Sequence, residues 1–157
     1  MQTIRYLGKE WPLKVVENPE VKKVNIHFEG EYLVLVSRET ETIDYKKVLV
    51  RFYKQQAKKH IEKRLRHFQP MIRKKVKSFT IESSEKRWGS CNSMGELTFN
   101  WQLMLFPEAA IDYVVVHELC HLEHLNHDRS FWRLVGKLSP NYKDIMPILG
   151  TTKTRDL

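Results

Sequence analysis

The chain has 157 residues, of which 41% are hydrophobic, and this length suits one domain with one hydrophobic core. It contains no run of roughly 18 apolar residues, so we expect no transmembrane helix and no membrane partner. The N-terminal residues lack the apolar run of a signal peptide, and a cytoplasmic protein is the simplest interpretation. The two cysteines, Cys91 and Cys120, form no CxxC pair, which argues against a thioredoxin-type site.

The net charge of +8 originates in one segment of the chain. Residues 1–50 carry 8 Lys or Arg against 8 Asp or Glu, and residues 81–157 carry 8 against 10. Residues 51–80 carry 11 against 1. A concentrated basic segment attracts anionic partners such as nucleic acid or a nucleotide. A solvated helix face explains the same charges equally well, so both interpretations stay open.

The first forty residues are expected to be rich in β-strands. Val24, Ile26 and Phe28 alternate with polar neighbours, and a second apolar run covers residues 32–36. Gly30 lies between the two runs and is free to adopt the positive φ that a tight turn requires. We therefore predict a β-hairpin centred on Gly30 within a β-rich part over residues 1–40.

From about residue 43 to residue 70 the apolar residues follow helical spacing. Lysines and arginines occupy most of the other positions around the axis. Thr42 is expected to cap the start of this helix, and Pro70 to end or kink it. The pattern predicts a long basic amphipathic helix, whose apolar stripe is formed by Val48, Phe52, Ile61, Leu65 and Phe68.

The C-terminal half is predicted to hold a hairpin and two further helices. Residues 96–101 alternate in polarity after a turn-rich segment, so a hairpin is expected around Met94. Pro107 suits the first position of a helix that continues to His121 and contains three consecutive valines. Such a run is typical of a buried helix. A shorter helix is expected over residues 130–138.

His117 to His121 form an HExxH motif. Residues four apart on an α-helix differ by about 40° around the axis, so both imidazoles can bind one zinc ion at about 2.0–2.1 Å. Glu118 is rotated by about 100° from His117, which places it beside the metal as a base for the activated water. The simpler explanation is a hydrogen-bonded core histidine pair, but it would leave a carboxylate buried beside valines without a partner.

A catalytic zinc site uses three protein ligands and one open position. His127 is expected to supply the third ligand if the helix ends near His124 and Asn126 adopts a left-handed conformation that turns the chain back. His124 is an alternative third ligand, one turn beyond His121. A structural zinc site is usually cysteine-rich and closed, which this pattern is not. Imidazole also binds iron, nickel and copper, so other divalent transition metals are alternatives to Zn²⁺.

Several charged or hydroxyl-bearing residues flank the motif. Glu123 or Asp128 could accept a hydrogen bond from a ligand imidazole, although surface charge is the simpler interpretation. A zinc hydrolase also needs donors for a developing oxyanion, and Arg87, Arg129 and Tyr142 are the candidates. The sequence does not place any of these three relative to the motif.

A set of motifs between residues 86 and 142 carries a resemblance to a known family: Arg87-Trp88-Gly89-Ser90-Cys91, Asn100-Trp101, Pro107, the run from Ile111 to Leu122, Asn126-His127 and Phe131-Trp132. They resemble those of the YgjP-like metallopeptidases. The resemblance implies His117, His121 and His127 as the metal site, within residues 107–132, and Glu118 as the base. Cys120 stands where alanine is expected.

The same resemblance implies an α+β, zincin-like fold over residues 1–157. In it, a small antiparallel sheet packs on the metal-bearing helix, with the long basic helix behind the sheet. Residues 96–101 would form an edge strand to which an extended peptide adds. The SprT-like and WLM proteases, which act on proteins attached to DNA, share the HExxHxxxxxH pattern, and by analogy this draws attention to the basic segment at 51–80.

Three functions are compatible with the sequence. The first is a zinc metallopeptidase acting on a peptide or protein. The second is a metal-dependent phosphohydrolase acting on nucleotides, whose phosphates lysines and arginines would hold. The third is a non-enzymatic nucleic-acid-binding module that keeps a metal for stability, with strongly salt-dependent binding through residues 51–80.

Overall fold

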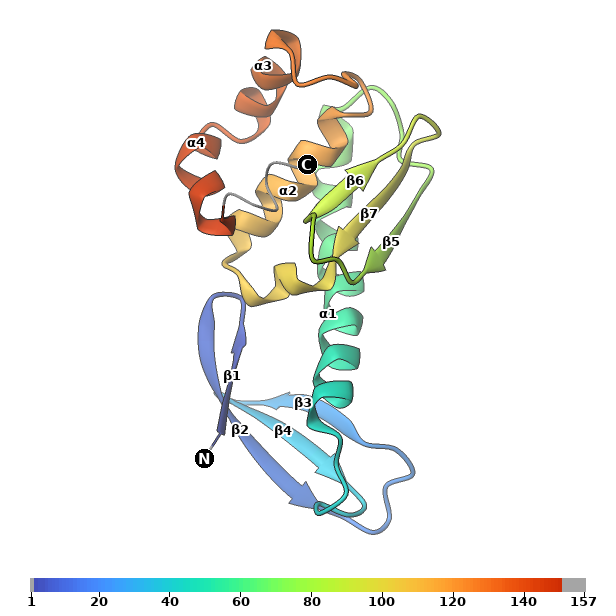
Figure 1. Ribbon diagram of the computed structural model, residues 1–157, viewed down its shortest axis with the longest axis vertical. Helices are drawn as coiled ribbons and strands as arrows, with labels where there is room; N and C mark the ends of the chain where they lie inside the picture. Colours follow the sequence, from blue (N-terminus) through green and yellow to red (C-terminus); the bar gives the residue numbers. More distant parts are fainter. Residues whose placement is uncertain (1, 151–157) are drawn as a thin grey trace.

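A long helix, α1 (Tyr45–Phe68), connects two small β-sheets that lie at different heights along it (Figure 1). The computed structural model describes residues 2–150, so residue 1 and residues 151–157 of the predicted domain lie outside this description. A four-stranded sheet packs near the start of α1, and a three-stranded sheet and the remaining helices gather around its second half. The predicted α+β class is therefore confirmed.

The N-terminal sheet has the strand order β1-β2-β4-β3. Strands β2 and β4 are parallel, and the other two pairs are antiparallel. Gly30 has a φ of +60° between β3 and β4, so the predicted hairpin is confirmed. Phe28 of β3 contacts Phe52 of α1 with ring centroids 5.9 Å apart, which joins this sheet to the helix. The strands are β1 (Gln2–Tyr6), β2 (Lys9–Glu17), β3 (Asn25–Glu29) and β4 (Tyr32–Ser37).

Helix α1 confirms the predicted long basic helix, with a different cap. Asp44, not Thr42, caps the helix, because Asp44 directly precedes the first helical residue and its carboxylate accepts the Lys47 N–H at 3.2 Å. The α-helix ends at Phe68, and Pro70 lies in the 3₁₀ turn that follows. No helix within residues 2–150 is long and apolar enough to cross a membrane. The buried stripe of α1 is Phe52, Tyr53, Ala57, Ile61, Leu65 and Phe68.

The second sheet contains β5 (Ser78–Glu82), β6 (Gly89–Cys91) and β7 (Glu96–Asn100) in the order β5-β7-β6. The predicted hairpin is confirmed as β6 and β7, with Gly95 at φ +80° in its turn. The expected antiparallel sheet is wrong, because the chain passes through β6 before β7 returns parallel to β5. The expected edge strand over residues 96–101 is also wrong, because β7 is the middle strand and the edges are β5 and β6.

Helix α2 (Glu108–Cys120) is buried at 10 of its 13 residues, which agrees with the prediction from its valine run. Pro107 is the residue before the helix rather than its first residue, a difference within the usual uncertainty of helix ends. Helices α3 (Arg129–Leu138) and α4 (Tyr142–Ile145) cover α2 on the side away from the second sheet (Figure 1). The predicted helix over residues 130–138 is therefore confirmed as α3.

An ion pair between α1 and α2 joins the scaffold to the metal-bearing helix. Arg64 donates two hydrogen bonds to the Asp112 carboxylate, at 2.7 and 3.0 Å, and both side chains are less than one third exposed. We expect Asp112→Asn to lower the free energy of unfolding by about 1–2 kcal/mol, because it removes one charge from a paired, partly buried carboxylate. Urea denaturation measures this change.

The matched control is Arg66→Gln on the same helix. Arg66 pairs with Glu62 at 3.1 Å, but its side chain is 78% exposed. Solvent screens such a pair, so this change should cost less than about 0.5 kcal/mol. Equal effects of the two substitutions would contradict a bridging role for the Arg64–Asp112 pair.

Candidate metal centre

His117 lies in the last turn of α2 and His121 caps the C-terminus of this helix, so the two side chains lie one turn apart, as the HExxH spacing predicts. Both are buried, with 2% and 8% of their surface exposed. The ring centroids lie 4.9 Å apart. Because α2 is held on all sides by apolar neighbours, these two imidazoles have little freedom to move relative to each other.

His127 comes from the segment between α2 and α3 and completes a cluster of three imidazoles. Its Nε2 lies 3.2 Å from the Nε2 of His117 and 3.0 Å from the Nε2 of His121. Two nitrogens bound tetrahedrally to one zinc ion at about 2.05 Å stand about 3.3 Å apart. The arrangement therefore fits one transition-metal ion bound by three Nε2 atoms.

His124, the alternative third ligand, does not belong to this cluster. Its backbone carbonyl instead accepts a hydrogen bond from the Nδ1 of His121 at 3.0 Å. A carbonyl oxygen can only accept, so Nδ1 of His121 carries the proton and Nε2 presents a lone pair toward the cluster. Burial also lowers the pKa of His121, which favours the neutral imidazole that a metal requires.

The hydroxyl of Tyr113 lies 3.1 Å from Nδ1 of His117. It lies four residues earlier on α2, where an i,i+4 search of the sequence would have found it. Glu123 and Asp128, which we considered as acceptors of a hydrogen bond from a ligand imidazole, have other partners. Glu123 accepts the Arg73 N–H at 2.6 Å, and Asp128 caps α3 by accepting the Phe131 N–H at 3.0 Å.

The chain reverses between α2 and α3 without the left-handed residue expected at Asn126. Within residues 2–150, Leu7 is the only non-glycine residue with a positive φ. The helix ends earlier than expected, at Cys120, and tight turns follow, in which His124 N–H donates to the Cys120 carbonyl at 2.9 Å. The Asp128 cap then starts α3 directly after His127. Consecutive turns and a new helix cap replace the single left-handed residue.

Two aromatic residues of α3 hold the imidazoles in place. Phe131 stacks on His121 with ring centroids 4.5 Å apart. Trp132 stacks on His127 with ring centroids 5.9 Å apart. Tyr142 of α4 stacks in turn on Trp132, at 5.3 Å. His127 is exposed at the surface, so this stacking, rather than burial, limits its motion.

Glu118 is fully buried, and neither of its carboxylate oxygens has a hydrogen-bond partner in the structure. Burial raises the pKa of Glu118 to about 8, and the positive charge of Arg87 acts in the opposite direction. A buried carboxylate without partners is costly unless a cation or a water donor compensates it. A metal ion and its water beside the three histidines would supply both, so these residues fit a metal site.

Gly89 of β6 makes room for this carboxylate. A Cβ atom at this position would lie 3.1 Å from Oε2 of Glu118 and 3.0 Å from the Thr98 carbonyl oxygen. Both contacts are tighter than ordinary packing allows. The glycine of the Arg87-to-Cys91 motif therefore serves the close approach of β6 to α2, a role that the sequence did not reveal.

The three candidates for oxyanion stabilisation occupy different places. Arg87 donates to both oxygens of Glu82, at 2.9 and 3.1 Å, while contributing positive potential at Glu118. Arg129 is exposed at the first turn of α3. Tyr142 is connected to His127 through the stacked Trp132. An oxyanion role for any of them stays a prediction.

A cavity of about 590 Å³ opens beside the cluster. It lies between the β6–β7 turn, the segment before β5 and the loop that carries the third histidine. Of the three clustered histidines, His121 lines it. The remaining lining residues are Lys74, Lys75, Asn92, Ser93, Met94, Gly95, Leu122, Glu123, His124, Leu125, Asn126 and Asp128.

We expect Tyr113→Phe to weaken metal affinity by about 10–100-fold while the fold persists, because His117 loses the hydroxyl that orients its ring. Isothermal titration of the metal-free protein with zinc measures the affinity, and circular dichroism checks the fold. Unchanged affinity would show that packing alone orients His117.

Comparison with known proteins finds one matching protein family and a similar solved structure. The family model described as "YgjP-like, metallopeptidase domain" matches residues 1–151. The chain is also similar to the crystal structure of the metallopeptidase zymogen of Pyrococcus abyssi abylysin, at 27% sequence identity and a TM-score of 0.49. That match covers 54% of this chain and 87% of the other. Comparison with curated proteins gives no match.

Proposed function

Because the chain belongs to the YgjP-like metallopeptidase family, we propose that it is a zinc-dependent peptidase with Glu118 as its general base. One observation carries the proposal. The Nε2 of His127 lies within hydrogen-bonding distance of the Nε2 atoms of both His117 and His121, on the same helix–loop unit that buries an unpaired carboxylate. Neither feature is favourable alone, and a metal ion with a water molecule accounts for both.

His117, His121 and His127 would hold the ion, and a site with three protein ligands would leave room for water or substrate. When bound, zinc supplies a Lewis acid that polarises a carbonyl group and lowers the pKa of water toward about 7. Three neutral imidazoles also suit other transition metals, and zinc is proposed because it commonly combines such ligands with hydrolysis.

Glu118 takes the proton from the attacking water and delivers it to the leaving amine. Its burial is important here, because a carboxylate excluded from bulk solvent keeps the proton close to the reacting atoms. Gly89 keeps the space beside its Oε2 open. The same carboxylate can therefore act first as a base and then as an acid without leaving its position.

Strand β6 is the sheet edge next to this carboxylate, and it replaces β7 as the strand that would bind substrate. Gly89 of β6 lies against Glu118, and one side of β6 has no strand partner within residues 2–150. An extended peptide added to this side would pass beside the histidine cluster. The proposal therefore favours extended, unfolded segments as substrates over folded surfaces.

We expect Glu118→Gln to retain zinc and to lower peptide hydrolysis by about 10²–10⁴-fold, because the amide keeps the size of the side chain but cannot accept the proton. An unbiased peptide library analysed by mass spectrometry measures cleavage, and elemental analysis measures zinc.

Nucleoside triphosphates in the same assay test the alternative reaction. Nucleotide turnover without peptide cleavage would favour the phosphohydrolase, and full activity of Glu118→Gln on peptides would overturn the role of this residue. Cleavage that disappears on zinc removal and returns on zinc addition would support the peptidase.

A further inference from the structure

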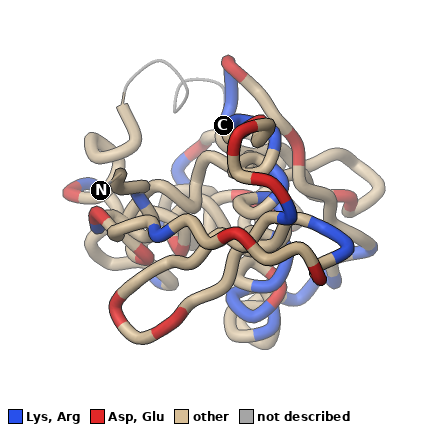
Figure 2. Tube along the Cα trace, turned by 90° about the horizontal axis from the view of Figure 1, so that it is seen from below, with Lys and Arg blue, Asp and Glu red and all other residues tan. Residues whose placement is uncertain are grey.

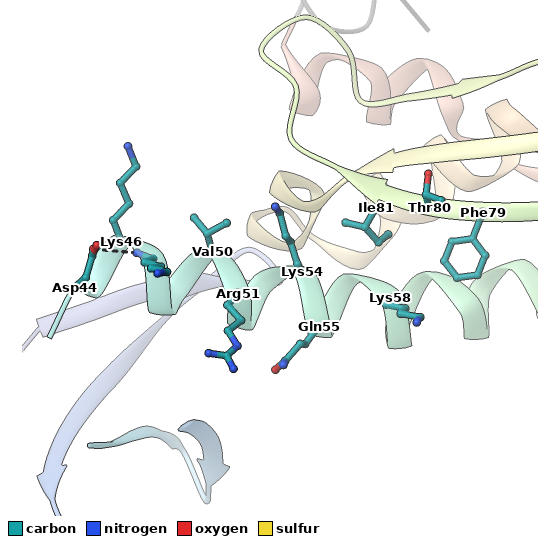
Figure 3. A pocket seen from close by; sticks show the side chains of 11 residues that line it. Asp44, Lys46, Val50, Arg51, Lys54, Gln55, Lys58, Phe79, Thr80 and Ile81 are labelled. Atoms are coloured by element: carbon teal, nitrogen blue, oxygen red, sulfur yellow. Dashed lines mark hydrogen bonds between the residues drawn. The ribbon is translucent and has the colours of Figure 1, made fainter. Parts of the chain in front are cut away.

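A second and larger cavity, of about 870 Å³, lies between α1 and the edge strand β5 (Figure 3). None of the three clustered histidines lines it. In the sheet order β5-β7-β6 it borders the edge opposite β6, the strand beside Glu118. This groove, which we call the α1–β5 groove, is lined by Asp44, Lys46, Lys47, Val50, Arg51, Lys54, Gln55, Lys58, Phe79, Thr80 and Ile81.

The helical wall of the α1–β5 groove is strongly basic. Lys47, Arg51, Lys54 and Lys58 follow i, i+4, i+7, i+11 spacing, so they form a stripe about 16 Å long and about 60° wide. All four are exposed. The one acidic lining residue, Asp44, already accepts the Lys47 N–H as the helix cap. Figure 2, which looks from below at α1 nearly end-on, shows Lys and Arg around its turns.

The strand wall of the groove is the free edge of β5. Phe79, Thr80 and Ile81 are consecutive residues, yet all three line the groove. Successive side chains of a strand point to opposite faces, so a groove lying on one face would touch only every second residue. The groove therefore includes the backbone edge, where β5 has no strand partner within residues 2–150. Unpaired N–H and C=O groups on such an edge can bind another strand.

We propose that the α1–β5 groove binds an extended acidic segment of a partner protein, which adds to β5 as a further strand. In Figure 3, Phe79 points from β5 toward α1, and Lys54 rises from α1 on the side where β5 lies. Alternate side chains of the added strand would point toward α1 in the same way. They would be spaced by about 6.6 Å, close to the 4.5–6 Å rise between successive cations of the stripe. Acidic residues at alternate positions match this wall.

The groove suits a peptide better than single-stranded nucleic acid, the partner considered from the charge of residues 51–80. Bases have no complement to a strand edge, and recognition of single strands relies on aromatic stacking. Phe79 is the one aromatic residue lining the groove, and its ring is half-buried against Phe99, 6.5 Å away. The edge of β5, which has no strand partner within residues 2–150, instead offers N–H and C=O groups that an extended peptide backbone can pair with.

The test uses full-length Glu118→Gln protein, so that binding is measured without turnover and independently of the peptidase proposal. The probe is a fluorescein-labelled peptide of about seven residues with alternating glutamate and valine. A second probe replaces the valines by proline, which keeps the charge but cannot extend a strand ladder. A third is oligothymidylate of equal charge. Fluorescence anisotropy gives the affinities, and deuterium exchange follows the amides of residues 78–82.

We expect the Glu-Val peptide to bind and to slow exchange in β5, and the proline peptide to bind at least about tenfold more weakly. Lys54→Glu with Lys58→Glu should weaken binding about tenfold or more, because two attractive charges become repulsive. The control Lys59→Glu, an exposed lysine on the same helix outside the groove, should change it less than about twofold. No peptide binding, equal binding of the proline peptide, tighter binding of oligothymidylate, or no difference between the two sets of variants would each overturn the proposal.

Discussion

The packing of α3 against the end of α2 is the constraint on which the candidate centre depends. His117 lies in the last turn of a rigid helix and His121 caps it, but His127 is exposed on a connecting segment and can bind a metal only if that segment is fixed. The Asp128 cap starts α3 immediately after it, and the rings of Phe131 and Trp132 stack on two of the three imidazoles. A helix, a helix cap and two aromatic rings therefore position the three imidazoles.

Burial of α2 then determines the chemistry. The apolar surroundings of α2 exclude bulk solvent from Glu118, and the same low polarity strengthens the effect of any cation placed beside it. Gly89 allows β6 to approach this carboxylate, so one edge of the three-stranded sheet lies beside the candidate metal centre. The other edge, β5, lies across the sheet beside the basic face of α1. The three-stranded sheet thus offers two different edges, one beside a carboxylate and one beside a row of cations.

Features that depend on a short stretch of sequence could be predicted. Helical periodicity was sufficient to place His117, Glu118 and His121 at the end of one buried helix and to identify α1 as long and basic. The parallel pairing of β5 with β7 could not be predicted, because alternating polarity marks the faces of a strand but not its neighbours. The reversal of the chain before His127 was predicted, but a left-handed residue was expected at Asn126 and is not found there. Turn preferences do not reveal that the helix already ends at Cys120. The space that Gly89 leaves is a tertiary contact with no local signal.

The most direct test of the account is the metal content of the purified protein and of two histidine variants. Wild-type protein supplied with zinc should contain about one ion per chain. His127→Ala should lose or markedly weaken this binding, since His127 Nε2 lies within 3.2 Å of both other ligand atoms, whereas His124→Ala should retain it because only its backbone carbonyl contacts the centre. Absence of metal from the wild type, or full zinc binding by His127→Ala, would contradict a three-histidine metal centre.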